Sequence, residues 1–311
     1  MHNESRKTIL AAMAANFAIA VAKAAAGLIG RSPAMLAEAA HSVADTMNQV
    51  FLLVSLSLGD RTPDEEHPFG YGKERFFWAF LAAVFIFVSG AVFSLYEGLR
   101  ALLGGEEVEA TFVVAYAVLG FSLVAEGASL WRAVSHVRAD ASAAGVRLRT
   151  FLQQSNDTTV RTVLFEDSVA VTGVVLALVG VGLHQLTGER LWEGLASIAI
   201  GLLLVVVAYV LGRDNKGLLI GEAARPEQRE RLRDVIAAHP EVEEVLELLT
   251  MHLGPSNLLV AVRLDLRDDL TAGEVEELSN RIDHELREAV PEVDQVFLDA
   301  TPRPRRAEQP I

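Results

Sequence analysis

The sequence predicts a membrane protein: an all-α bundle of six transmembrane helices, followed by a small α+β domain. Of the 311 residues, 51% are hydrophobic, and the mean hydropathy is +0.31. Long stretches without charge carry most of this apolar excess, which is typical of helices that cross a bilayer. After residue 214 the pattern changes to amphipathic segments that carry 12 Lys/Arg against 21 Asp/Glu. These observations predict a membrane domain over residues 1–214 and a soluble, acidic domain over residues 215–300.

Six apolar stretches are each long enough to cross a hydrocarbon core of about 30 Å. Lys and Arg gather at the amino end and in the second and fourth loops between these stretches. The positive-inside rule therefore predicts that both termini are cytoplasmic. The predicted spans are 8–30, 34–58, 76–103, 111–134, 158–184 and 191–212.

The C-terminal residues alternate between helical and strand periodicity. A proline near the first turn opens the first helix, and Thr271 with Glu274 predicts a capping box at the start of the second. The predicted order is helix 226–238, strands 242–251 and 258–266, helix 271–288 and strand 293–298. This order predicts a small open sheet with its helices on one face. Residues 301–311, rich in Pro and Arg, are predicted to be disordered.

Ionisable side chains inside a membrane span cost several kcal/mol and are functional candidates. His41 and Asp45 lie four residues apart in the second span, which puts them on one helix face with a rise of about 6 Å between them. Solvation of either side chain is unfavourable there, so the pair predicts a binding site for a divalent ion. Asn48, three residues further on, offers a carbonyl oxygen on the same side.

The fifth span supplies two adjacent carboxylates, Glu166 and Asp167. At membrane depth such neighbours repel, and one of them stays protonated unless a cation lies between them and the second span. A hydrogen-bonded pair with one neutral acid remains the alternative. Lys23 and Glu126 are predicted to be structural, paired with each other or with Glu38.

Several classes of protein are excluded. The chain has no cysteine, so it forms neither a disulfide nor a thiolate metal site, and oxygen and imidazole nitrogen must hold any metal. No basic patch indicates a nucleic-acid partner. A His-Glu-x-x-His protease helix is absent, because the run here is His41-Ser-Val-Ala-Asp45. Neither Asp45 nor Asp167 lies in a Gly-rich aspartyl-protease motif, so the sequence predicts no enzyme.

Three motifs stand out together: Ser32-Pro-Ala-Met-Leu-Ala-Glu-Ala-Ala-His-Ser-Val-Ala-Asp45, His67-Pro-Phe-Gly-Tyr-Gly-Lys73 and residues 218–224. With them, the chain resembles the cation diffusion facilitator (CDF) family of divalent-metal/proton antiporters. Residues 151–157, with Phe165-Glu-Asp167 and Asn48-Gln49, look most like the ZnT9-like branch of that family.

The resemblance implies a tetrahedral transport site midway through the membrane, between the second and fifth spans. Its implied protein ligands are His41, Asp45 and Asp167, with Glu166 favoured as the fourth. The family's usual fourth ligand would fall at Val163, which cannot coordinate a metal. A carboxylate oxygen suits a zinc-like site, but Asn48 or a water molecule stays open as the fourth ligand.

The resemblance also implies that the C-terminal domain is ferredoxin-like, cytoplasmic and dimer-forming. Asp64 and His67 align with a secondary metal site in the loop, where Tyr71 replaces the remaining histidine. The histidine-rich pattern of a metal-sensing domain is largely missing. The candidates there are scattered: His239, His252, His284 and Asp299.

The implied function is secondary active export of a divalent transition-metal cation from the cytoplasm in exchange for protons, with no prosthetic group. Metal binding requires a neutral imidazole and ionised carboxylates, so bound metal and bound protons exclude each other. Zinc is the favoured ion, with manganese, cobalt, nickel, iron and cadmium as alternatives, because nitrogen and oxygen ligands suit all of them. A passive channel and a non-transporting metal sensor or scaffold remain open.

The expected partners are the metal ion, protons, the lipid bilayer and a second copy of the chain as a homodimer. The expected location is a prokaryotic inner membrane, because the sequence shows no targeting segment.

Overall fold

The computed structural model describes residues 2–104, 112–143 and 158–301 and divides the chain into two compact units. The first unit contains the residues up to Leu53 together with Ala79–Gly212. The second contains Val54–Trp78 and the residues from Arg213 onwards. The connection between the second and third predicted spans therefore packs with the C-terminal residues. The division at residues 214 and 215 remains a prediction, and the tail 301–311 lies outside the described residues except for Thr301.

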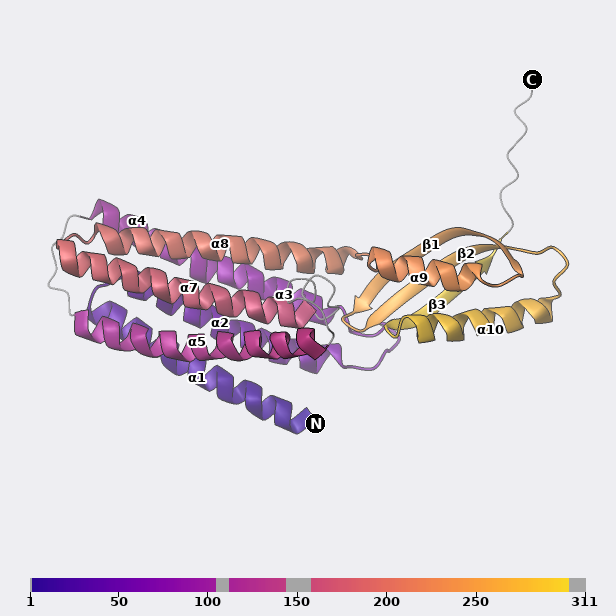
Figure 1. The fold of residues 1–311 in the computed structure, drawn as a ribbon, viewed down its shortest axis with the longest axis horizontal. Coiled ribbons are helices and arrows are strands. Elements are labelled where there is room, and N and C mark those ends of the chain that lie inside the picture. The colour runs from indigo at the N-terminus through magenta and orange to yellow at the C-terminus, as the bar shows by residue number, and fades with distance from the viewer. Residues whose placement is uncertain (1, 105–111, 144–157, 302–311) are drawn as a thin grey trace, which may run out of the picture. The chain divides into compact units, whose positions relative to one another are not determined.

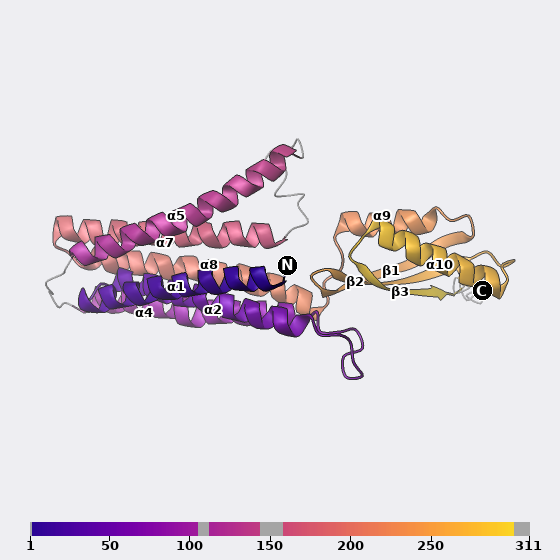
Figure 2. The ribbon, with the colours of Figure 1, turned by 90° about the horizontal axis from the view of Figure 1, so that it is seen from below.

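The first unit is helical, and its long helices run in a broadly common direction (Figures 1 and 2). Helix α5 diverges from α7 towards its carboxyl end (Figure 2). The helices that contribute to this unit are α1 (His2–Ile29), α2 (Pro33–Gly59), α3 (Glu74–Phe85), α4 (Phe93–Leu103), α5 (Phe112–Ala143), α7 (Thr158–Thr187) and α8 (Leu191–Ile220). Between α3 and α4 the chain continues as a π-helix, η1 (Ile86–Val92), instead of as a regular α-helix.

In the described part of the chain, four helical stretches are long and apolar enough to cross a membrane: Glu74–Leu103, Phe112–Ala139, Leu164–Thr187 and Leu191–Ile220. Met13–Ile29 is a shorter apolar helix. Helix α2 is 27 residues long, or about 40 Å at 1.5 Å per residue. Polar side chains interrupt its apolar sequence, which explains why composition alone does not select it. The helical membrane unit is thus established, and the count of six spans remains a prediction.

Glycines allow α4 and α8 to approach closely. A Cβ at Gly98 would lie 2.7 Å from the Ile198 side chain and 2.8 Å from the Gly194 carbonyl oxygen. A Cβ at Gly201 would lie 2.8 Å from the side chain of Leu95. Small residues at such positions let helix backbones pack against each other where lipid supplies no hydrophobic driving force. We conclude that α4 and α8 form a tightly packed pair in the membrane unit.

The C-terminal residues form a three-stranded sheet with two helices, in the order helix, strand, strand, helix, strand. The elements are α9 (Pro226–Ala237), β1 (Val242–Gly254), β2 (Asn257–Leu266), α10 (Ala272–Ala289) and β3 (Val293–Ala300). Strand β2 is central, antiparallel to β1 and parallel to β3. Both helices cover the same face of the sheet (Figure 2). The predicted element order and the helices on one face are confirmed.

The core of this sheet follows from the alternation predicted for β2. Leu258, Val260, Val262 and Leu264 are buried beneath Leu232 and Ile236 of α9 and Leu278, Ile282 and Leu286 of α10. The capping box at the start of α10 is also confirmed: the Glu274 backbone N–H donates to the Thr271 hydroxyl, and the Thr271 backbone N–H donates to the Glu274 carboxylate.

Candidate metal transport site

Helix α2 places His41 and Asp45 one turn apart, with 3.5 Å between His41 Nε2 and Asp45 Oδ2. The imidazole is buried, whereas the Asp45 side chain is 34% exposed. Among the residues that the structure describes, neither ring nitrogen of His41 has a hydrogen-bond partner. A buried polar group normally has a partner, because leaving it without one costs about 1–3 kcal/mol. The imidazole therefore offers an unused ligand atom beside a carboxylate.

Helix α7 contributes the two adjacent acids, and each contacts a different helix. The Asn48 amide of α2 donates to Glu166 Oε1 at 3.2 Å, and the Ser129 hydroxyl of α5 donates to Asp167 Oδ2 at 3.0 Å. Asn48 therefore acts as a hydrogen-bond donor that holds Glu166 towards α2. Asp167 lies on the side of α7 that packs against α5.

Negative charges gather where α2 meets α7. Asp45 is close enough to both Glu166 and Asp167 for their charges to interact. The three carboxylates repel each other unless protons or a cation compensate for their charge. The arrangement is therefore suited to exchange protons for a divalent cation.

The four predicted ligands do not converge on one point. Within the described ranges, no group of three or more His, Asp or Glu side chains is arranged to hold a metal ion. His41 and Asp45 form one pair on α2, and Glu166 and Asp167 are directed to separate hydrogen-bond donors. The four-ligand site thus remains a prediction that requires α2 and α7 to adjust around the ion.

The predicted pairing of Lys23 is confirmed. Its ammonium group donates to Glu38 Oε2 at 2.8 Å, to Glu126 Oε1 at 2.9 Å and to Ser42 Oγ at 3.0 Å. These contacts connect α1, α2 and α5 one turn before His41. The cluster fixes the part of α2 from which the candidate ligands project.

One buried ionisable group escaped the sequence analysis. Glu193 of α8 is 2% exposed, accepts a hydrogen bond from the Ser32 hydroxyl and lies 2.6 Å from His184 Nδ1. This contact joins α8 to the end of α7 and to the turn before α2. The sequence does mark Glu193 as a candidate, because it is an ionisable residue within the predicted span 191–212.

The loop residues Asp64, His67 and Tyr71 form a turn held together by Asp64. Its Oδ1 accepts the backbone N–H groups of Glu66 at 3.1 Å and His67 at 2.8 Å, and its Oδ2 accepts the Tyr71 hydroxyl at 2.6 Å. The Tyr71 hydrogen bond, followed by the backbone ones, lowers the pKa of Asp64. The same bond raises the pKa of Tyr71. Both oxygens of the Asp64 carboxylate thus accept hydrogen bonds from within the turn. A secondary metal site in this loop remains a hypothesis.

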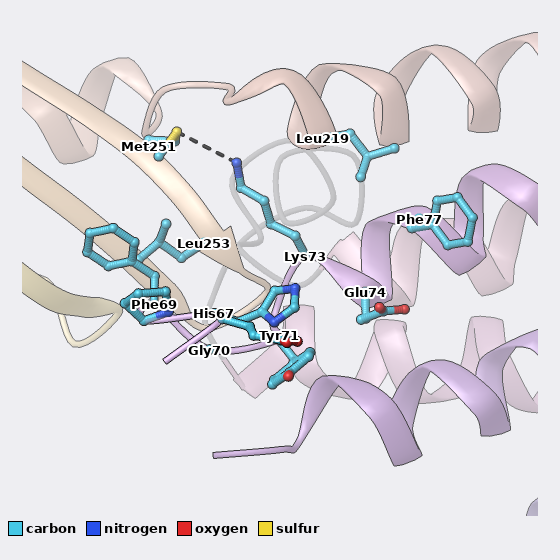
Figure 3. A pocket seen from close by; sticks show the side chains of 12 residues that line it. His67, Phe69, Gly70, Tyr71, Lys73, Glu74, Phe77, Leu219, Met251 and Leu253 are labelled. Carbon is cyan, nitrogen blue, oxygen red and sulfur yellow. Dashed lines mark hydrogen bonds between the residues drawn. The ribbon is translucent and has the colours of Figure 1, made fainter. Parts of the chain in front are cut away.

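A pocket of about 450 Å³ lies within the second unit, beside this turn (Figure 3). Its lining includes His67, Phe69, Lys73 and Met251, and the Lys73 ammonium lies 3.8 Å from the Met251 sulfur. The lining is mostly apolar, and the candidate transport site lies in the other unit. We assign the pocket no part in transport.

The histidines of the C-terminal domain have different local surroundings. His239 lies 3.3 Å from Glu285 and His284 lies 3.4 Å from Glu288. Burial lowers the pKa of His252. Each is a separate local contact, so regulatory metal binding in this domain remains untested.

The membrane helices carry a buried histidine beside a carboxylate, and a small sheet domain belongs to the same chain. Together they define the class of an integral membrane protein with a candidate cation site. Residues 9–220 match the family model of the cation efflux transmembrane domain, and residues 224–302 match that of the cation efflux protein cytoplasmic domain. The chain therefore belongs to the cation efflux family. This confirms the resemblance to cation diffusion facilitators, whose members are transporters and not enzymes.

Among its relatives are two proteins named proton-coupled zinc antiporter SLC30A9, mitochondrial. The Xenopus laevis protein is 36% identical over 234 residues, which are 75% of this chain and 42% of the relative. The Homo sapiens protein is 33% identical over 259 residues, which are 83% of this chain and 45% of the relative. The chain thus spans less than half the length of these two relatives, and their similarity confirms the likeness to the ZnT9-like branch. The manganese efflux system protein MneP of Bacillus subtilis is 25% identical over 96% of both chains.

Proposed function

We propose that this protein is a secondary active transporter that exports a divalent transition-metal cation, zinc first, from the cytoplasm in exchange for protons. One observation carries the proposal: within the described residues, the buried His41 imidazole has no hydrogen-bond partner, and it lies beside the Asp45 carboxylate. The names of the relatives support the cargo, because two are zinc antiporters and one is a manganese efflux protein. The transported ion is the substrate, and we propose no prosthetic group.

The proposed ligands are His41, Asp45, Asp167 and Glu166. The Asn48 amide already donates to Glu166, which supports Glu166 as the fourth ligand and Asn48 as the residue that orients it. When a divalent ion enters, α2 and α7 need to close by a small movement that replaces the two hydrogen-bond donors with the ion. One imidazole nitrogen and three carboxylate oxygens suit zinc and manganese, so the cargo is decided by geometry and by the supply of metal.

Exchange follows from the chemistry of these ligands. The ion needs the lone pair of a neutral imidazole and the charges of ionised carboxylates, so protonation of either weakens its binding. A proton gradient directed inwards can then drive the metal outwards when the site opens alternately to the two sides. The direction in the cell is inferred from the match to the cation efflux domain.

The finer architecture belongs to the same proposal. We infer six transmembrane spans, a ferredoxin-like cytoplasmic domain and a homodimer. The match to the cation efflux cytoplasmic domain and the order of strands and helices support the last two inferences. Both termini are inferred to be cytoplasmic, and a prokaryotic inner membrane is still the location we propose, although the zinc antiporter relatives are named mitochondrial.

The proposal is tested by His41→Ala and Asp45→Ala in vesicles that contain the purified protein. Each variant should lose zinc-stimulated proton flux almost completely, because each removes one of the few proposed protein ligands of the divalent ion. His136→Ala and Asp214→Ala are matched controls, since both side chains are exposed and lie outside the site. Flux like that of the unaltered protein in His41→Ala or Asp45→Ala would reject the site.

A further inference from the structure

A cluster of three charged side chains lies beside the candidate transport site and takes no part in it. Lys23 of α1 contacts Glu38 of α2 and Glu126 of α5 at 2.8 and 2.9 Å. The Lys23 and Glu38 side chains are 0% exposed, and that of Glu126 is 17% exposed. We call Lys23, Glu38 and Glu126 the lysine cluster.

The lysine cluster contains one cation and two carboxylates, so it has one excess negative charge when both acids are ionised. A charge without compensation in a membrane interior costs several kcal/mol, and binding one proton removes it. The structure also shows an oxygen available on each acid, because Glu38 Oε1 and Glu126 Oε2 are buried and have no hydrogen-bond partner in the described ranges.

Access favours Glu126 as the group that binds this proton. Glu38 is completely buried, and its free oxygen is directed at the backbone of Gly173 in α7, where an added Cβ would collide with it. Glu126 lies at the edge of the cluster and is the one member whose side chain is partly exposed. Glu126 can therefore bind a proton on its free oxygen without disturbing the contact between Lys23 and Glu38.

We propose that the Glu126 carboxyl group is a proton-binding site separate from the metal ligands, occupied when the transport site is empty and vacated when a divalent cation binds. The inference rests on the proposed function, and it adds one exchanged proton to those displaced from the ligands. In this step the O–H bond of Glu126 breaks, the electron pair stays on the carboxylate, and the proton passes to water.

Electrostatics supplies the coupling. In the described part of the chain, Glu126 forms its hydrogen bond and ion pair with Lys23 and none with the four proposed ligands. The charged groups that face it are Lys23 from α1 and Glu38 and His41 from α2. From α7, Asp167 reaches α5 at Ser129, one turn beyond Glu126. A cation bound at His41 adds positive charge near Glu126 and thereby favours the ionised carboxylate.

The test counts the protons released when zinc binds to the full-length protein in detergent. Calorimetric titrations in buffers of different ionisation enthalpy give this number without requiring transport. Glu126→Gln mimics the protonated acid, so it should bind zinc and release about one proton fewer per ion than the unaltered protein. Glu126→Asp should restore the released proton.

Glu97→Gln is the matched control, since Glu97 is a largely buried acid of α4 paired with Arg100 at 3.6 Å. Glu97→Gln should leave the number of protons released per zinc ion unchanged. An equal number of protons from Glu126→Gln and from the unaltered protein would overturn the inference and leave the proposed function intact. Failure of the unaltered protein to bind zinc at all would instead overturn the proposed function.

A second measurement does not depend on how the Gln variant folds. The infrared spectrum of the zinc-free, unaltered protein should contain the carbonyl band of protonated carboxylic acids, and zinc should remove it. Glu126→Asp should shift part of this band, which protonated ligand carboxyls alone would not produce. The absence of any such band before zinc is added would overturn the inference.

Discussion

Gly173 of α7 is the residue on which the lysine cluster depends for space. A Cβ there would collide with Glu38 Oε1, and Glu38 cannot retreat without losing its 2.8 Å contact with Lys23. We predict that Gly173→Ala lowers the stability of the protein by about 1–3 kcal/mol, as overpacking of a filled interior does. The loss outweighs the gain in helix propensity from glycine to alanine, which is up to about 1 kcal/mol. The measurement is thermal unfolding in detergent.

Gly182 gives the matched control within the same helix. A Cβ at Gly182 would lie 3.7 Å from the Tyr116 hydroxyl, an ordinary van der Waals contact. Gly182→Ala should therefore leave the midpoint of thermal unfolding unchanged or raise it. Equal midpoints for Gly173→Ala and the unaltered protein would contradict the packing of Glu38 against α7.

Single residues also show where sequence reasoning succeeds. The pairing of Lys23 with Glu38 and Glu126 was predictable, because a charge in an apolar span needs an opposite charge and the sequence offers few. The contact between His184 and Glu193 was not identified, because both lie near span ends, where water usually solvates charge. Sequence identifies which groups need a partner, and the fold decides which partner they meet.

At the scale of elements, α10 depends on its capping box. The Thr271 backbone N–H and hydroxyl both donate to Glu274, and these bonds lower the pKa of Glu274. We predict that Thr271→Ala destabilises the start of α10 by about 1 kcal/mol, as loss of an N-cap does. Hydrogen exchange of the first-turn amides of α10 should then be about fivefold faster in the full chain, since that free energy is a fivefold change in the opening equilibrium.

The contribution of Glu274 to stability depends on pH in a definite direction. Because folding lowers the pKa of Glu274, its contribution to stability is present above the unfolded pKa and is lost as the pH falls through the folded pKa. Ser279→Ala is the control, since the Ser279 hydroxyl donates to the Val275 carbonyl oxygen inside the same helix and caps nothing. First-turn exchange in Thr271→Ala that matches Ser279→Ala would show that the box does not stabilise α10.

Elements differ in how far sequence predicts them. The helices and strands of the C-terminal domain were predicted to within a few residues, because caps and alternation are local signals. The π-helix η1 was not, since the predicted span 76–103 has one uninterrupted apolar pattern. Local sequence patterns also cannot predict whether the four candidate ligands converge, because this depends on the separation between α2 and α7.

For the whole molecule, the candidate site is compatible with three alternative functions: an antiporter, a passive channel and a sensor that binds metal without transport. The proton requirement of the ligands separates them, because a carrier that alternates between metal and protons couples the two gradients. A channel conducts down the metal gradient alone, and a sensor shows binding without flux.

We predict that vesicles containing the protein, with an acidic interior and the membrane voltage clamped at zero, accumulate zinc against its gradient. Each exchanged proton contributes about 1.4 kcal/mol per pH unit. The limiting ratio of internal to external zinc should therefore rise about tenfold per pH unit for every proton exchanged, and the slope gives the stoichiometry. His41→Ala vesicles are the control for leakage. Zinc entry at a rate independent of the pH difference would identify a channel, whereas stoichiometric binding without entry would identify a sensor.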